Sequence, residues 1–318
     1  DMDIILGGEV GGYLTEYMIP LGEKVMEYLL QVNPQADVET YPVHGEKGHT
    51  DMVRVRVPGK NGKSKGGTAP TIGLLGRLGG IGARPEVTGF VSDGDGALAA
   101  LSAAAELLSM AKKGDLLEGD VFLSTHVCPD APTLPHKPVP FMNSPVSMVE
   151  MNREEVVEEL DAILCVDTTK GNRIYNKKGI AISPTVKEGY ILRVSEDLLS
   201  VLETVTGELP GVFALTTQDI TPYGNGVLHL NSILQPSTAT KAPVVGVAIT
   251  TQSIVAGCAS GATHFEDVET AARFMIETAK AFGAGNCLFY DVEEYNRLLS
   301  LYGPMNHIQT LGKESLHA

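Results

Sequence analysis

The spacing of apolar residues predicts one helix and one strand in the N-terminal part of the chain. Residues 21–31 have the period of an amphipathic helix, and in residues 49–58 valines alternate with arginines, as in a half-buried strand. Residues 59–67, GKNGKSKGG, predict a flexible polar turn. This turn is not a phosphate loop, because Val57 stands where that motif needs its first glycine.

From residue 71 onward, short apolar runs alternate with helical stretches. The predicted strands are residues 71–76, 87–92, 120–126, 161–167, 212–217 and 243–250. The predicted helices are residues 96–113, 152–160, 195–205 and 265–282. This order is typical of βαβ units, so we expect an α/β fold of three α/β/α layers around a mostly parallel central sheet.

Length and composition place the chain among large soluble proteins. With 318 residues and 43% hydrophobic content, we expect one domain, with two as the alternative. No run of eighteen apolar residues and no basic-then-apolar leader is present, which favours a cytoplasmic protein without a membrane partner. The four cysteines are far apart, without CxxC spacing, and we expect reduced thiols: Cys128, Cys165, Cys258 and Cys287.

The charge of the chain bears on its partners. A formal net charge of −15 repels phosphate backbones, and no basic stripe interleaved with aromatic residues is present. We therefore expect no nucleic-acid partner and interpret the charge as a solvated acidic surface.

Polar residues follow several of the predicted strands. Because ligands of parallel sheets bind outside the carboxyl ends of the strands, we expect these residues to line one crevice: Asp93, Asp95, His126, Cys128, Asp130, Asp167, Gln218 and Asp219. Carboxylates and imidazoles are ligands for zinc or manganese. Each residue also has a structural alternative, namely a helix cap, a core histidine, a turn aspartate or a buried thiol.

Two further segments are candidates for binding. The glycine-rich loop 76–85 lacks the GxGxxG pattern, but its glycines allow close approach, and Arg77 and Arg84 could hold a carboxylate or phosphate. The alternative is a tight turn with solvent-facing arginines. His49-Thr50-Asp51 could present its outer residues to a metal, and His264, before Glu266-Asp267, could be a late ligand or part of a helix cap.

Residues 70–131 resemble the core of the co-catalytic zinc exopeptidases, a superfamily of aminopeptidases, carboxypeptidases and deacylases. Residues 92–108, SDGDGALAALSAAAELL, look like the segment that carries the metal-bridging aspartate, with Asp93 as the match. Residues 162–169, AILCVDTT, look like the next ligand segment, and residues 242–275 look like the last strand, histidine loop and closing helix. Coverage is about residues 70–285, leaving 1–68 as an N-terminal helix and strand region and 286–318 as a helical tail.

The chain departs from that pattern at three places. Residues 76–78, GRL, stand where the superfamily has its HxD motif, residues 126–130, HVCPD, replace the Glu-Glu pair, and His264 comes several residues late. The resemblance therefore implies either a rearranged site or a scaffold without its metals. Residues 76–97 also resemble a prokaryotic family known as a domain of unknown function.

Three functions are consistent with these observations. The first is a metal-dependent hydrolase of an amide bond in a small peptide-like or acylated amino-acid substrate. Its expected residues are Asp93, Asp95, Asp167, His126 and His264 on zinc or manganese, His126 and Asp130 in catalysis, and Arg77, Gly79, Gly80 and Arg84 on the substrate.

The second function is a non-catalytic scaffold that binds a small anionic ligand through the loop 76–84. The third is a metal-free enzyme that uses Cys128 with His126 or His136. The proline-rich residues 129–145 form a loop long enough to serve function or an interface. By analogy with the superfamily, we expect a homo-oligomer.

Overall fold

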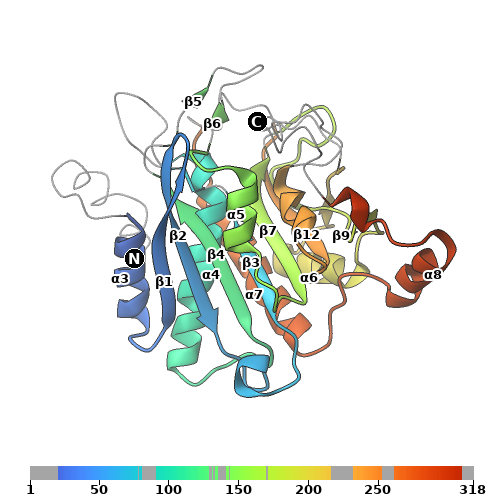
Figure 1. The fold of residues 1–318 in the computed structure, drawn as a ribbon, viewed down its shortest axis with the longest axis horizontal. Coiled ribbons are helices and arrows are strands. Elements are labelled where there is room, and N and C mark those ends of the chain that lie inside the picture. Colours follow the sequence, from blue (N-terminus) through green and yellow to red (C-terminus); the bar gives the residue numbers. More distant parts are fainter. Residues whose placement is uncertain are drawn as a thin grey trace.

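A ten-stranded sheet forms the centre of the molecule (Figure 1). The structure is a computed structural model, and it describes residues 21–77, 79–80, 91–128, 131, 133–134, 141–142, 144–169, 171–215, 232–252 and 261–309. Eight strands lie in the order β1-β2-β4-β3-β7-β12-β8-β11, and β9 and β10 extend it beside β12. The remaining described strands, β5 and β6, form a separate two-stranded sheet.

The bounds of the strands are as follows: β1 Asp37–Gly45, β2 Gly48–Val57, β3 Ile72–Gly76, β4 Val121–Val127, β5 Thr133–Leu134, β6 Phe141–Met142, β7 Ala162–Thr169, β8 Gly179–Ile182, β9 Val186–Lys187, β10 Tyr190–Ile191, β11 Gly211–Val212 and β12 Val244–Thr250. The α-helices are α3 Leu21–Val32, α4 Asp95–Lys112, α5 Met148–Glu155, α6 Glu196–Thr206, α7 Phe265–Gly283 and α8 Val292–Tyr302. Four 3-10 helices complete the described elements: η1 Lys63–Lys65, η2 Ser92–Gly94, η3 Ser232–Thr238 and η4 Asn306–Ile308.

The four central strands, β4, β3, β7 and β12, are parallel. Antiparallel pairs flank them, with β2 beside β4 on one side and β8 beside β12 on the other. The central strands are almost wholly buried and rich in Val, Ile and Leu, as expected for parallel strands covered on both faces. The prediction of an α/β fold with a mostly parallel central sheet is thus confirmed.

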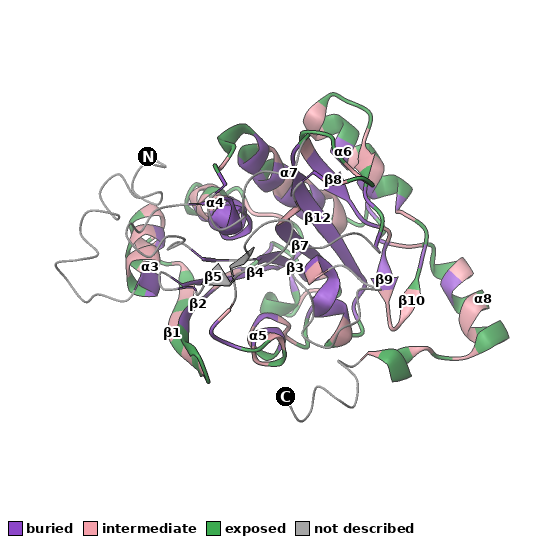
Figure 2. Cartoon of the chain, turned by 90° about the horizontal axis from the view of Figure 1, so that it is seen from above, coloured by how far each residue is buried: buried purple, intermediate pink, exposed green. Residues whose placement is uncertain are grey.

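The two faces of the sheet are covered differently (Figure 2). The helices α3, α4, α6 and α7 cover one face and enclose the largest apolar core, which includes Leu29, Leu101, Leu202 and Phe274. The other face packs against α5 and η3, through a smaller core that includes Ile233 and a cluster around Met151. A complete three-layer arrangement and the division into segments remain predictions.

Most of the predicted elements agree with the structure to within a few residues, but three differ. The strand predicted at residues 212–217 is the two-residue β11, and the helix predicted at 152–160 is α5, four residues earlier. Ser147 begins that helix with a capping box, since its side chain accepts from the Glu150 N–H while Glu150 accepts from the Ser147 N–H. Most of the strand predicted at residues 87–92 lies outside the described residues, and Ser92 itself begins η2.

The polar turn at residues 59–67 is held by one carboxylate. Asp120 accepts hydrogen bonds from the Gly59 N–H at 2.8 Å and from both the N–H and the hydroxyl of Ser64. Partial burial by itself raises the pKa of Asp120, but these hydrogen bonds together outweigh it, so the net pKa is lowered. In the described part of the chain, no helix is long and apolar enough to cross a bilayer.

Two glycines bring α4 into close contact with the end of β3. A Cβ atom added to Gly96, in the first turn of α4, would lie 1.7 Å from the carbonyl oxygen of Arg77. A Cβ atom added to Gly76 would lie 2.4 Å from the carbonyl oxygen of Gly96. The helix therefore packs directly on the backbone at the carboxyl end of the strand.

Replacing Gly96 by Ala tests this close approach. The added methyl group has to displace the backbone of β3 or α4, so we expect a loss of about 2 to 3 kcal/mol in the free energy of unfolding, measured by urea denaturation. Glu106→Ala, on an exposed position of the same helix, is the control and should change the free energy by less than about 0.5 kcal/mol. Equal stability of the two variants would show that Gly96 does not lie against the Arg77 carbonyl group as described.

Candidate functional site at the carboxyl edge of the sheet

Side chains at the carboxyl ends of the parallel strands divide between the two faces of the sheet. Along β7, Leu164 and Val166 belong to the core under α4, whereas Ile163 and Cys165 belong to the core on the opposite face. Strand side chains alternate, so Asp167 leaves the sheet on the face of α5. Thr168 leaves on the face of α4, where its hydroxyl donates to the Ser92 carbonyl at 2.7 Å.

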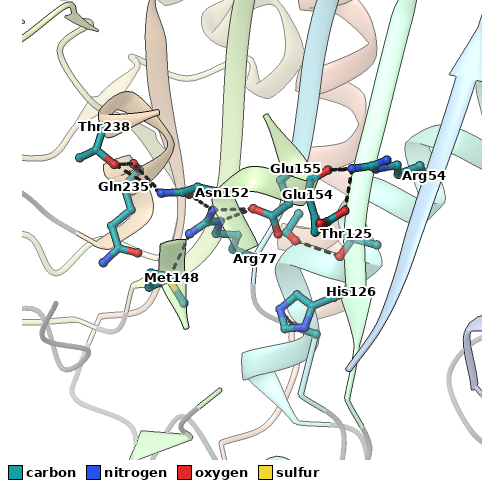
Figure 3. A network of polar contacts seen from close by, with 12 residues as sticks. Arg54, Arg77, Thr125, His126, Met148, Asn152, Glu154, Glu155, Gln235 and Thr238 are labelled. Atoms are coloured by element: carbon teal, nitrogen blue, oxygen red, sulfur yellow. Dashed lines mark hydrogen bonds and ion pairs between the residues drawn. The ribbon is translucent and has the colours of Figure 1, made fainter. Parts of the chain in front are cut away.

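A buried ion pair occupies the α5 face at the end of β3 (Figure 3). The Arg77 Nε donates to Glu155 Oε2 at 2.7 Å, and Nη2 lies 2.5 Å from the same oxygen. Nη2 also donates to Asn152 Oδ1 at 2.5 Å, and Nη1 donates to the Met148 sulfur at 3.3 Å. The side chains of Arg77 and Glu155 are 3% and 0% exposed, so the pair is inside the protein.

The pair is tied to the rest of this face through α5. Asn152 Nδ2 donates to the Gln235 carbonyl and to the Thr238 hydroxyl, both in η3. One residue before Glu155, the carboxylate of Glu154 accepts from Arg54 of β2 at 3.0 Å. Two adjacent glutamates of α5 thus bind one arginine of β2 and one that directly follows β3.

Burial and charge act against each other on Arg77. Burial lowers the pKa of Arg77, but the Glu155 carboxylate more than compensates, and the net pKa is raised. Cys165 and Asp167 contribute further to this rise, which places both near the guanidinium. Burial beside this pair raises the pKa of the Cys165 thiol far above its ordinary value, so the thiol is protonated and unreactive at neutral pH.

These contacts change the interpretation of Arg77. A residue that clamps a substrate carboxylate must present its N–H groups to the ligand, but those of Arg77 face Glu155, Asn152 and Met148. Arg77 organises the architecture of the site, and the geometry does not support the predicted direct contact with substrate. Arg84, its predicted companion, lies outside the described residues.

His126 is a buried residue of β4, on the same face as Arg77. Thr50 donates its hydroxyl proton to the Val127 carbonyl and therefore accepts from His126 Nδ1 at 2.8 Å. His126 Nε2 accepts from the Gly79 N–H at 3.2 Å. Both ring nitrogens have protein partners, an arrangement that does not support the predicted role as metal ligand or base.

The environment of His126 also determines its charge. Burial, and secondly the positive charge of Arg77, lower the pKa of His126 from 6.5 to about 3. The imidazole is consequently neutral at physiological pH. His126 is a satisfied core histidine, one of the alternatives left open by the sequence.

Gly79 and Gly80 extend the sheet beyond β3. The Gly79 carbonyl accepts from the Cys128 N–H at 2.9 Å, and Gly80 forms a parallel bridge with Cys128. A Cβ atom on Gly79 would lie 1.5 Å from the His126 carbonyl oxygen. Close packing against β4 therefore explains the glycine at position 79, and the contact of Gly79 and Gly80 with substrate remains a prediction.

Asp93 and Asp95 lie on the α4 face. The N–H of neighbouring Ser92 donates to the Gly261 carbonyl at 2.9 Å, and Asp95 Oδ1 accepts from the Thr263 hydroxyl at 2.6 Å. Both carboxylates are buried, as is Asp167 across the edge. The structure thus brings the three aspartates to one edge of the sheet but to different faces of it.

The predicted metal ligands do not form a cluster within the described residues. No three His, Cys, Asp or Glu side chains in that part of the chain could together hold a metal ion. His264 precedes α7 as an exposed residue. The potential metal-binding side chains among the described residues therefore do not fit the metal pair that the resemblance implies. Asp130, His136 and Cys258 lie outside the described residues.

Sequence reasoning missed the partners of Arg77. Glu155 and Asn152 were assigned to a helix but not to the site, because 78 and 75 residues separate them from Arg77. A signal was present in the capping box of Ser147 and Glu150, which places Asn152 and Glu155 one turn apart near the helix end.

Residues 41–312 match a protein family described as "Protein of unknown function (DUF1177)". The chain belongs to this family. No curated protein matches the sequence. The match spans every strand of the sheet except the start of β1, together with the Arg77 network.

Solved structures resemble this DUF1177 chain at low sequence identity. The bottromycin maturation enzyme BotP aligns with a TM-score of 0.51 and 15% identity over 89% of this chain and 69% of BotP. A glutaminyl cyclase from an Acidobacteriales bacterium has a TM-score of 0.47 and 13% identity over 84% of this chain and 88% of the cyclase. The LapA aminopeptidase of Legionella pneumophila has a TM-score of 0.46 and 11% identity over 84% of this chain and 62% of LapA. The likeness to BotP shows a shared fold alone.

The buried pair can be tested by a double-mutant cycle on Arg77 and Glu155. Glu155→Leu leaves a buried guanidinium without its anion, and we expect a loss of about 3 to 5 kcal/mol in the free energy of unfolding. The double variant Arg77→Met with Glu155→Leu should be more stable than Glu155→Leu alone, because no charge is left unpaired. The exposed pair of Arg273 and Glu269 is the control, and Glu269→Gln should cost less than about 1 kcal/mol.

The low pKa of His126 predicts a pH dependence of stability. As the pH falls below 6.5, the unfolded chain binds a proton at this histidine, whereas the folded protein does so only near its pKa of about 3. The free energy of unfolding therefore decreases as the pH falls from 6.5 to about 3. His126 accounts for no more than about 1.4 kcal/mol of this decrease per pH unit. Urea denaturation between about pH 5 and 7.5 should show a shallower slope for His126→Gln than for wild type. Identical slopes would mean that His126 is protonated in the folded protein.

Proposed function

We propose that the protein binds a small peptide-like or acylated amino-acid molecule at the carboxyl edge of the sheet, without requiring a metal ion. The observation that carries the proposal is the buried Arg77–Glu155 pair at the end of β3. It modifies the second function expected from the sequence, because Arg77 supports the site and does not clamp the ligand. The class of ligand follows from the hydrolase-like fold and from the resemblance of residues 70–285 to exopeptidases.

Electrostatics support a site that works without metal. A metal ion binds where several anionic or imidazole ligands converge, but the end of this central strand carries a permanent guanidinium within electrostatic reach of Asp167. The guanidinium engages the Glu155 carboxylate in the buried ion pair, so Glu155 Oε2 is already bound and is not available as a metal ligand. Asp167, at the edge of this face, is therefore the described carboxylate that we assign to ligand binding.

A metal-dependent amide hydrolase is the second candidate. It is favoured by the burial of Asp93, Asp95 and Asp167 at one edge of the sheet. Its zinc or manganese would need ligands from outside the described residues, of which Asp130 is one that the sequence predicts.

Ligand-induced stabilisation tests the proposal. Untagged protein in EDTA is screened by thermal unfolding against short peptides and N-acylated amino acids. A ligand at a hundred times its Kd stabilises by about 2.7 kcal/mol, which should raise the Tm by about 5 °C. Asp167→Asn should abolish this rise. Asp161→Asn, at the opposite end of the same segment, where the carboxylate accepts from the Thr71 N–H, is the matched control and should retain it.

Metal analysis of the same preparation, before EDTA, separates the candidates. Stoichiometric zinc or manganese that is lost in Asp93→Ala, with amide hydrolysis that depends on it, would replace the proposal by the second candidate. Metal-free protein whose Tm responds to no member of the screen would contradict both.

A further inference from the structure

Two histidines face each other at the tip of the β1–β2 hairpin. Gly45 pairs with Gly48 around a two-residue turn, and His44 pairs with His49. The centroids of the two imidazole rings are 5.6 Å apart, with an angle of 36° between the ring planes. Both side chains are exposed to solvent.

The type of strand pair brings these side chains as close as a hairpin allows. Opposed residues of antiparallel strands alternate between hydrogen-bonded and non-hydrogen-bonded pairs. Pro42, opposite Asp51, has no N–H, so its pair is not hydrogen-bonded, and the His44–His49 pair two residues further is of the same kind. Cα atoms in such pairs are about 4.5 Å apart, against about 5.5 Å in the other kind.

The backbone around the pair is held in place by packing. A Cβ atom on Gly45 would lie 2.3 Å from the Pro145 carbonyl oxygen, so the hairpin tip rests on that segment. The His49 carbonyl accepts from the Cys128 thiol at 3.7 Å, and the next residue, Thr50, holds His126. The backbone positions of the two histidines are therefore set before any ligand binds, which reduces the entropy cost of binding.

His49 does not use the partner that the sequence suggested. Asp51, the other end of the His49-Thr50-Asp51 motif, is buried, and its Oδ2 accepts from the Gly22 N–H of α3 at 3.0 Å. This carboxylate anchors a helix. The neighbour of His49 is instead the imidazole of His44, because the strand register pairs these two residues.

We propose that His44 and His49 form a surface site for one divalent transition-metal ion of the Cu²⁺, Ni²⁺ and Zn²⁺ class. Imidazole nitrogens suit these metals, with Cu²⁺ bound most tightly. Metal–nitrogen bonds of about 2 Å place the centroids of two rings on one metal roughly 4.5 to 6 Å apart, a range that includes the observed spacing. Water completes the coordination, so binding is reversible. This site does not rest on the proposed function.

Titration of the untagged full chain with Ni²⁺ by calorimetry tests the site. We expect one equivalent to bind, and we expect His44→Gln and His49→Gln each to weaken binding at least tenfold, because either change removes the chelate. His307→Gln, at an exposed histidine of η4, is the control and should bind as wild type does. Cu²⁺ added at one equivalent should show two nitrogen ligands by electron paramagnetic resonance, and one in either single variant.

Two results would overturn the proposal. One is a wild-type protein that takes up no Ni²⁺ in the titration. The other is binding that both hairpin variants retain at wild-type affinity, which would place the metal elsewhere on the chain. Circular dichroism of each variant verifies the fold, and these surface changes should leave it intact.

Discussion

The burial of one positive charge at the end of the central strand organises much of this structure. A guanidinium inside a protein needs an anion and further acceptors, since its desolvation costs several kcal/mol. Arg77 obtains these from the last turn of α5, where Asn152 and Glu155 are three residues apart and share a helix face. Through Asn152 the same contacts reach η3. The covering of one face of the sheet is thus arranged around a single side chain.

The backbone of the same residue fixes the other face. Its carbonyl group lies where the side chain of Gly96 would be, so α4 can approach only because that position has no side chain. The N–H of Arg77 continues the ladder to β7 by donating to the Val166 carbonyl at 2.7 Å. Arg77 therefore connects β3, at whose end the candidate site lies, to helices on both faces of the sheet. Its side chain binds α5 and its backbone contacts α4.

The fold was largely predictable and the site was not, for physical reasons. Hydrophobic periodicity depends on local sequence, and the helices α3, α4, α6 and α7 follow it closely. The short strands near the end of the sheet, β8 to β11, have too few residues for a period to be read. The site depends on contacts between distant segments, such as Arg77 with Glu155, which no local pattern encodes.

The sequence also did not show on which face of the sheet each strand-end residue lies. Strand alternation places Cys165 and Asp167 on one side of β7 and Thr168 on the other, but only the packing of η2 against Thr168 shows which side holds Asp93 and Asp95. The sequence grouped these carboxylates at one edge of the sheet and could not divide them between its two faces. Pro42 limits strand pairing at the outer edge of β1. In the described part of the chain β1 ends the sheet, and the proline leaves the outer side of this nine-residue strand without one hydrogen-bond donor near its middle. A neighbouring molecule cannot extend the sheet there in regular register, so the hairpin can display its histidines to solvent while resisting self-association through its backbone.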